Sequence, residues 1–210
     1  MFEVKEINET AIEYDFVDST TLASSIDKET NQKVLQVYKY LKDKYILDLI
    51  PTYSTLAVHF TSKCKLFLDI HAFDKEIKAY LNQDYTVDSK HHLIFVDYNG
   101  PDIEELCNTL KLTKEELIYI HTRSTYTIAM LGFKEFFPYL FGLDQRLNIP
   151  RRKSPRKFVK KGAVAIAAGQ CGIYSQNSPG GWHILGYTDF DDFKNLKPSD
   201  TIEFRRHDVN

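Results

Sequence analysis

The stretch GQCGIYSQNSPGGWHILGYT, residues 169–188, holds the side chains best suited to chemistry on an amide. In it, the side-chain amide of Gln170 and the phenol of Tyr174 could polarise an amide carbonyl through hydrogen bonds that strengthen as charge develops on the oxygen. We therefore expect Gln170 and Tyr174 to be catalytic. The alternative is a buried pair of hydrogen-bonded side chains.

The same stretch continues into a turn that contains Ser178, Gly180 and Gly181. Two adjacent glycines adopt positive φ readily and could expose backbone N–H groups to an anion, in the geometry called a nest. We expect these three residues to bind a substrate or anion, with Trp182 anchoring the loop. The alternative is a plain β-hairpin beside a packed tryptophan.

Positive charge is concentrated between Arg146 and Lys161, where the chain has eight basic residues and no acidic one. Prolines frame Arg151 and Arg156, and the restricted backbone could aim a guanidinium at a phosphate or carboxylate. We expect both arginines to bind a substrate anion, although a solvated face remains the alternative. Nucleic acid is not favoured, because the net charge is −2 and the run has one aromatic residue, Phe158.

Two further candidates precede a β-rich segment. His121 is a possible general base, and Arg123 is a possible anion ligand. No partner that would set the histidine tautomer is identifiable from the sequence, so a structural histidine is the alternative. No metal site is expected, because the pairs His91–His92 and His71–Asp74 lack a fuller set of ligands.

The composition is that of a globular protein, with 43% hydrophobic and 27% charged residues. The three cysteines (Cys64, Cys107 and Cys171) are odd in number and far apart, which fits neither a disulfide framework nor a metal knuckle. No apolar run approaches the ~18 residues that a membrane span needs, and the N-terminus does not resemble a signal peptide. We expect a reduced, cytoplasmic protein without membrane contact.

Local patterns predict an α+β chain with two parts, residues 1–88 and 89–210. From the N-terminus, alternation and helical spacing predict a split-βαβ sandwich in the order βαββαβ, whose last strand lies past residue 88. Its elements are strands at 11–17, 46–51, 55–60 and 92–97, and helices at 27–44, capped by Asp27, and 72–82. In the second part, two short helices at 102–110 and 114–120 precede β-rich pieces separated by Gly and Pro turns, which suggests a barrel. The barrel pieces are 125–131, 163–168, 171–174, 183–187 and 201–205.

Four segments appear in an order typical of one family: LGFKEFFPYLFGLD (131–144), IPRRKSPR (149–156), GQCGIYSQNSPGGWHILGYT (169–188) and LKPSDTIEF (196–204). Together they resemble the family of 5-oxoprolinase B subunits, which includes the kinase-inhibitor protein KipI. The same domain is similar to subdomain C of the carboxyltransferase of biotin-dependent urea carboxylase, also called allophanate hydrolase subunit 1. The resemblance implies a cyclophilin-like β-barrel in the C-terminal part.

The resemblance also implies a function. The family's members act with a homologous, carboxyltransferase-like C subunit and with a separate A subunit, and convert 5-oxoproline to glutamate with hydrolysis of ATP. We expect ATP, with Mg²⁺ as its counter-ion, to be bound with or by a partner, because the chain has no Walker-type loop. Two alternatives stay open: an inhibitor of a sensor histidine kinase, and the carboxyltransferase component of a urea or amide carboxylase.

Five positions depart from the pattern of that family. Glu135-Phe136 replaces a Pro-Gly pair, Ala165 and Ala168 replace glycines, and Tyr187 replaces an arginine. We expect the two alanines to be mild changes inside a strand. Loss of the glycine at position 136 should alter a loop backbone, and loss of the arginine at position 187 removes a charge.

Overall fold

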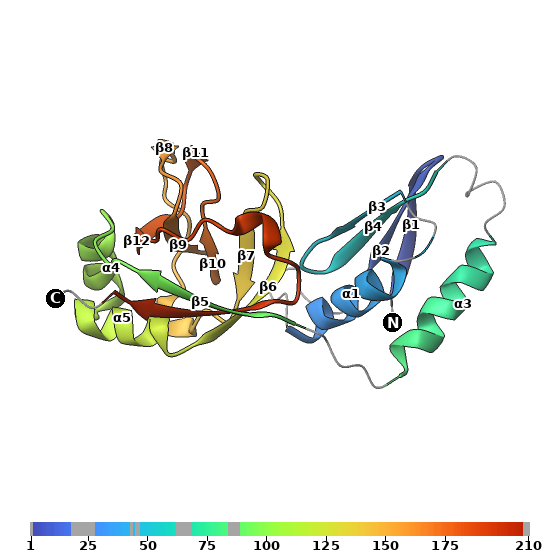
Figure 1. Ribbon diagram of the computed structural model, residues 1–210, viewed down its shortest axis with the longest axis horizontal. Coiled ribbons are helices and arrows are strands. Elements are labelled where there is room, and N and C mark those ends of the chain that lie inside the picture. Colours follow the sequence, from blue (N-terminus) through green and yellow to red (C-terminus); the bar gives the residue numbers. More distant parts are fainter. Residues whose placement is uncertain are drawn as a thin grey trace. The chain divides into compact units, whose positions relative to one another are not determined.

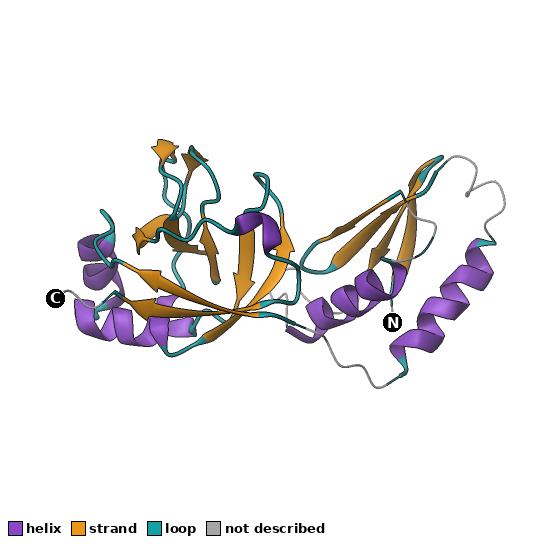
Figure 2. Cartoon of the chain, in the orientation of Figure 1, coloured by secondary structure: helices purple, strands orange, loops and turns teal. Residues whose placement is uncertain are grey.

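The computed structural model describes residues 2–17, 28–42, 44, 47–61, 69–83 and 89–207. The chain divides into two compact units, Met1–Asp88 and Ser89–Asn210 (Figure 1). Helices and strands occur in both units, as Figure 2 shows, and the second unit is richer in strands. The predicted α+β class is confirmed.

The first unit is built on an antiparallel sheet in the order β1-β2-β4-β3. Its strands are β1 (Glu3–Asn8), β2 (Ala11–Asp15), β3 (Asp48–Pro51) and β4 (Thr55–His59). Because β2 and β3 both pair antiparallel with β4, they run parallel to each other on its two sides. Helix α1 (Lys28–Leu41) lies between β2 and β3 in the chain, so the predicted split-βαβ unit is confirmed.

Helices cover this sheet, because α1 packs on β3 and β4 and also on α3 (Ile70–Leu81). The core contains Ile12, Val34 and Leu56. The Tyr14 hydroxyl donates to Asp74 of α3 at 2.8 Å, and burial raises the pKa of this phenol. The helix predicted at 72–82 begins two residues earlier, and the predicted cap Asp27 lies outside the described residues.

One strand of this unit was missed and another was misplaced. Strand β1 exposes all six of its residues, so it shows no apolar alternation to predict it from sequence. The strand predicted at 92–97 is β5 (His91–Val96), and it pairs with a strand of the second unit instead. Its placement in the order βαββαβ was wrong, because local alternation does not say which sheet a strand joins.

The second unit is a seven-stranded, nearly closed barrel in the order β12-β9-β10-β7-β6-β13-β5. Among its described strand pairs, β13–β5 alone is parallel. Besides β5, its strands are β6 (Thr125–Leu131), β7 (Pro138–Phe141), β9 (Ala163–Ala167), β10 (Gln170–Ile173), β12 (His183–Tyr187) and β13 (Thr201–Arg206). The predicted barrel-like second part is therefore confirmed, although the short strand β7 was missed.

The barrel closes where the end of β5 meets β12. Asp97 and Tyr187 exchange two backbone hydrogen bonds, of 2.8 and 3.0 Å. Gly186 allows this approach, because a Cβ at this position would lie 2.9 Å from the Asp97 carbonyl carbon. Closure leaves a central core that includes Ile94, Ile166 and many other apolar side chains.

Helices α4 (Ile103–Leu110) and α5 (Lys114–Thr122) pack on each other and on this barrel, α4 against β12 and α5 against β13. The predicted capping box at the start of α5 is present, with Thr113 and Glu116 satisfying each other's backbone N–H groups. Of the helices in the described ranges, none has both the length and the apolarity needed to cross a bilayer.

A separate two-stranded ribbon stands on the barrel, made of β8 (Arg156–Val159) and β11 (Ser178–Gly180). Both strands were missed, because each has at most four residues and β11 contains a proline. The ribbon brings residues from two distant parts of the sequence to one side of the barrel.

Ala168 lies in a turn, and not inside a strand as expected from sequence. Residues Ala168 and Gly169 form the two-residue connection between β9 and β10, with φ values of 50° and 74°. This backbone is typical of a type I′ turn, in which glycine is favoured because a Cβ is strained at positive φ. The expectation of a mild change at this position was wrong.

We predict that Ala168→Gly stabilises the protein. Relief of the left-handed strain should raise the free energy of unfolding by about 1 kcal/mol, as measured by urea denaturation. The control is Ala165→Gly, in the middle of β9, which should lower it by a similar amount, about 1 kcal/mol. Destabilisation by both substitutions would contradict the assignment of strain to Ala168.

Candidate functional site

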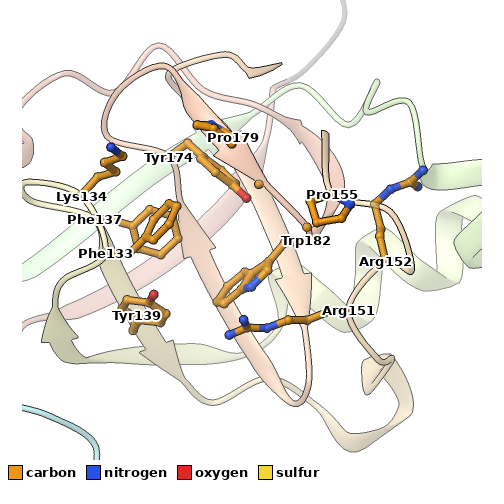
Figure 3. Close-up of a pocket in the computed structure, with 12 residues that line it drawn as sticks. Phe133, Lys134, Phe137, Tyr139, Arg151, Arg152, Pro155, Tyr174, Pro179 and Trp182 are labelled. Carbon is orange, nitrogen blue, oxygen red and sulfur yellow. The ribbon is translucent and has the colours of Figure 1, made fainter. Parts of the chain in front are cut away.

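A pocket of about 390 Å³ lies between the ribbon and one side of the barrel (Figure 3). Residues of β7, of the ribbon, of the loops after β6 and before β8, and of the segments that directly follow β10 and precede β12 contribute to it. The lining residues are Phe133, Lys134, Phe137, Tyr139, Arg151, Arg152, Pro155, Tyr174, Pro179, Gly180, Gly181 and Trp182.

The walls of this pocket are aromatic and belong to a packed cluster. The Phe137 ring meets Tyr174 and Trp182 edge to face, with ring centres 5.2 and 5.8 Å apart. The Tyr139 ring also meets Trp182, with ring centres 5.7 Å apart. Since these rings also pack on Ala165 of the barrel, the walls are held in place before any ligand binds.

Tyr174 places a hydroxyl against the ribbon. A Cβ on Gly180 would lie 2.7 Å from the Tyr174 Cζ, so the tyrosine fits only because position 180 has no side chain. Burial raises the pKa of Tyr174, and the Trp182 backbone N–H and the nearby arginines Arg156 and Arg151 only partly offset this. The hydroxyl therefore keeps its proton and can donate it in a hydrogen bond.

Two neighbouring arginines behave differently at the edge of the pocket. In Figure 3 the Arg151 side chain runs beside Trp182 toward Tyr139, while the Arg152 guanidinium points away from the aromatic walls. Arg151 is exposed, and its charge lowers the pKa of Tyr139, which burial raises more strongly. The pocket thus combines apolar walls with one guanidinium, a combination suited to a small ring that carries a carboxylate.

Arg152 turns away because a buried carboxylate holds it. Asp102 is 1% exposed, and its Oδ1 accepts from Arg152 Nη1 at 2.7 Å and from Arg156 Nη2 at 2.6 Å. Its Oδ2 accepts from the backbone N–H of Ile184 at 2.7 Å. Arg152 also contacts the exposed Glu105 at 3.2 Å, so the charges of both arginines are compensated by carboxylates.

The same cluster contains a group with metal-ligand chemistry. The ligand atoms of Asp102, Glu105 and His183 lie within 4.8 Å of one another. A cation would have to displace two guanidinium groups from Asp102, because these already occupy its Oδ1. We therefore assign the cluster to ion pairing with arginine.

The structure brings together several of the residues selected from sequence. Arg151, Tyr174, Gly180 and Gly181 line the pocket, and Arg156 lies beside it on Asp102. Ser178 starts the same strand as Gly180 and is buried, with no hydrogen-bond partner for its hydroxyl among the described residues. Their roles in binding and catalysis stay predictions.

The backbone expected of the glycine pair was wrong. Neither Gly180 nor Gly181 has positive φ, so the pair does not form the nest inferred from sequence. Gly180 instead pairs with Arg156 in the ribbon and makes room for Tyr174. At Gly181 a Cβ would meet only Pro155, at the ordinary contact distance of 3.7 Å.

Three selected residues lie apart from the lining of the pocket. His121 is fully buried in the barrel core, where its Nδ1 contacts the Tyr98 hydroxyl at 2.7 Å and its Nε2 contacts Cys171 at 3.4 Å. Burial lowers its pKa to about 3, so the ring is neutral. This position favours a structural role. Arg123 pairs with Asp144 at 2.9 Å, and Gln170 lies at the start of β10, outside the pocket.

Phe133, Phe137 and Tyr139 were not predicted as site residues, although the density of aromatic residues in 133–139 was a visible signal. Asp102 was not predicted either. No local pattern could have shown this residue, because its partners are about fifty and eighty positions away in the sequence.

Comparison with known proteins identifies a family and several relatives that this chain resembles. Residues 5–202 match the family described as carboxyltransferase domain, subdomain C and D. A protein named as the B subunit of 5-oxoprolinase from Bacillus subtilis (strain 168) is 41% identical over 117 residues, which is 54% of this chain and 49% of that relative. The match therefore spans about half the length of the Bacillus protein. A 5-oxoprolinase B subunit from Escherichia coli O157:H7 is 27% identical over 210 residues, 94% of this chain and 93% of that relative.

Solved structures show the same architecture. TTHA0988 superposes on 96% of this chain with a TM-score of 0.79 and 26% identity, and the match covers 40% of that protein. The urea carboxylase of Kluyveromyces lactis superposes on 99% of this chain with a TM-score of 0.69, and the match covers 22% of that enzyme. Its identity is only 15%, so it is evidence for the fold alone.

We predict that Gly180→Ala disturbs the pocket, because the added methyl group overlaps Tyr174. It should lower the free energy of unfolding by roughly 1–3 kcal/mol and change the fluorescence of Trp182, the single tryptophan. Gly181→Ala is the matched control and should change neither quantity. Equal effects of the two substitutions would show that Tyr174 does not depend on the missing side chain at position 180.

Proposed function

The chain belongs to the family of carboxyltransferase domains, subdomains C and D, and on this premise we propose that it acts as the B subunit of a heteromeric, ATP-dependent 5-oxoprolinase. The observation that carries the proposal is the pocket, whose aromatic walls and single inward-pointing guanidinium suit a small ring with one carboxylate. The relatives named as B subunits of 5-oxoprolinase support this choice of substrate.

In the proposed complex, 5-oxoproline lies with its ring against Trp182 and its carboxylate on Arg151. The pocket is large enough for such a ligand, and apolar walls favour a ring over a hydrated ion. Tyr174, which keeps its proton, donates to the lactam oxygen and stabilises the negative charge that grows there. These side chains bind and orient the substrate.

Hydrolysis of ATP serves the difficult step, because a lactam carbonyl is a poor electrophile. Transfer of the γ-phosphoryl group to the lactam oxygen releases ADP and makes the lactam carbon more electrophilic. Water then adds to this carbon and the ring C–N bond breaks, which leaves an acyl phosphate that a second water hydrolyses to glutamate and phosphate. Carboxylates already hold Arg152 and Arg156, which leaves little positive charge here for a triphosphate. We assign ATP and its Mg²⁺ to a site formed with the A or the C subunit of the complex.

A second candidate is a carboxyltransferase component that accepts a carboxyl group from a biotin-bearing partner. The family description and the shared fold of the Kluyveromyces lactis urea carboxylase favour it. The two candidate functions require different co-substrates. The carboxyltransferase needs carboxybiotin, whereas the 5-oxoprolinase needs ATP and no biotin. No described feature favours inhibition of a histidine kinase.

We predict that the isolated chain does not convert 5-oxoproline and that a complex reconstituted with the A and C subunits converts it with ATP consumption. Arg151→Gln in this complex should raise KM for 5-oxoproline at least about tenfold, because it removes a charge-assisted hydrogen bond. Coupled assays of glutamate and ADP measure both results. Lys153→Gln, a nearby exposed position outside the pocket, is the control and should leave KM unchanged.

Two results would contradict the proposal. One is full turnover by the isolated chain, which would show that partners are unnecessary. The other is a complex that is silent with ATP but carboxylates an amide when carboxybiotin is supplied, which would select the second candidate.

A further inference from the structure

Of the three arginines around the pocket, two form ion pairs with carboxylates of the described residues and one does not. Asp102 and Glu105 carry two negative charges, and Arg152 and Arg156 carry two positive charges, so this cluster is balanced. Among the described residues, no ion pair involves Arg151 at 4.0 Å or less. Figure 3 places the remaining cation, Lys134, beyond Phe133 and away from Trp182.

The pairing of Arg152 and Arg156 depends on the single side chain of Asp102. Asp102 occupies the position before α4, but its carboxylate makes no cap hydrogen bond to that helix and is directed at the arginines instead. Arg152 lines the pocket, and its backbone N–H donates to the Gly181 carbonyl at 2.8 Å, so only its side chain is turned away from a ligand. Without Asp102, only the exposed Glu105, among the described residues, would still hold the Arg152 guanidinium, which could then rotate toward the pocket.

We propose that Asp102 is a specificity-determining residue, which makes the pocket select ligands with one negative charge over ligands with two. By holding Arg152 and Arg156, it leaves Arg151 as the guanidinium that meets a ligand. Beside Trp182, a second carboxylate or a phosphate would lose its hydration without gaining a second guanidinium, because Lys134 lies on the far side of Phe133 (Figure 3). The inference deepens the proposed function and rests on it, because it takes the same pocket as the ligand site.

The substitution Asp102→Asn tests this with little change of shape. The asparagine carbonyl can still accept from the Ile184 N–H, which preserves the link between α4 and β12. Its amide nitrogen then faces the guanidinium groups and, being a donor, cannot bind them. The variant should therefore keep the fold and release Arg152 and Arg156.

The probes are a matched pair of cyclopentane acids, cyclopentanecarboxylate as the monoanion and cis-cyclopentane-1,3-dicarboxylate as the dianion. Binding is followed by the fluorescence of Trp182, which lines the pocket, and by calorimetry. Wild type should bind the monoanion more tightly. In Asp102→Asn, the affinity for the dianion relative to the monoanion should rise about tenfold, the effect of one charge-assisted hydrogen bond.

Two further variants separate this role from a structural one. Asp102→Asn combined with Arg152→Gln should lose most of the gain for the dianion, because the released guanidinium is then missing. Glu104→Gln removes an exposed carboxylate from the first turn of the same helix and should leave the ratio of affinities unchanged. A merely structural role of Asp102 would weaken both probes alike and leave this ratio constant.

An unchanged ratio in Asp102→Asn would overturn the proposal, as would the absence of binding of both probes to wild type. If Asp102→Asn does not fold, Glu105→Gln takes its place. It loosens Arg152 alone and should shift the ratio in the same direction, by about threefold. Because the probes are neither substrates nor lactams, these outcomes are independent of turnover. An inactive complex with this selectivity intact would refute only the 5-oxoprolinase function.

Discussion

The buried carboxylate of Asp102 joins three parts of the second unit that are distant in sequence. It lies at the start of α4, accepts from the backbone of β12 and binds two arginines, one of which begins the ribbon. A carboxylate in such an interior is tolerated only when donors surround it, and Asp102 has three. This set of contacts therefore links the ribbon, and with it one wall of the pocket, to α4 and β12.

The opposite rim of the pocket is fixed by a strained loop. Phe133 and Phe136 both have φ of 60°, a conformation that bulky side chains rarely adopt. Hydrogen bonds hold the loop in this state, including one from Ser175 Oγ to the Glu135 carbonyl at 2.7 Å. Strain of this kind persists where surrounding contacts determine the backbone, and it clusters at functional sites. The pocket therefore lies between two rigidly held edges.

Local patterns predicted those elements whose signal is carried by neighbouring residues. The capping box of α5 and the β-rich segments at 125–131 and 183–187 were found for this reason. The ribbon was not, since its two short strands become strands only by pairing with each other. The residues of the site divide in the same way, into those with a local sequence signal and those without one. Tyr174 and Arg151 were selected from motifs, whereas Asp102 acts through partners that only the folded chain brings near.

A crystal structure of the chain with 5-oxoproline would test the central claim most directly, because that claim concerns where a ligand lies and which cation it meets. We expect the ring of the ligand against Trp182, its carboxylate on Arg151, its lactam oxygen near the Tyr174 hydroxyl, and Arg152 still on Asp102. Ligand density outside this pocket, or a carboxylate held by Arg152 in place of Arg151, would contradict the account.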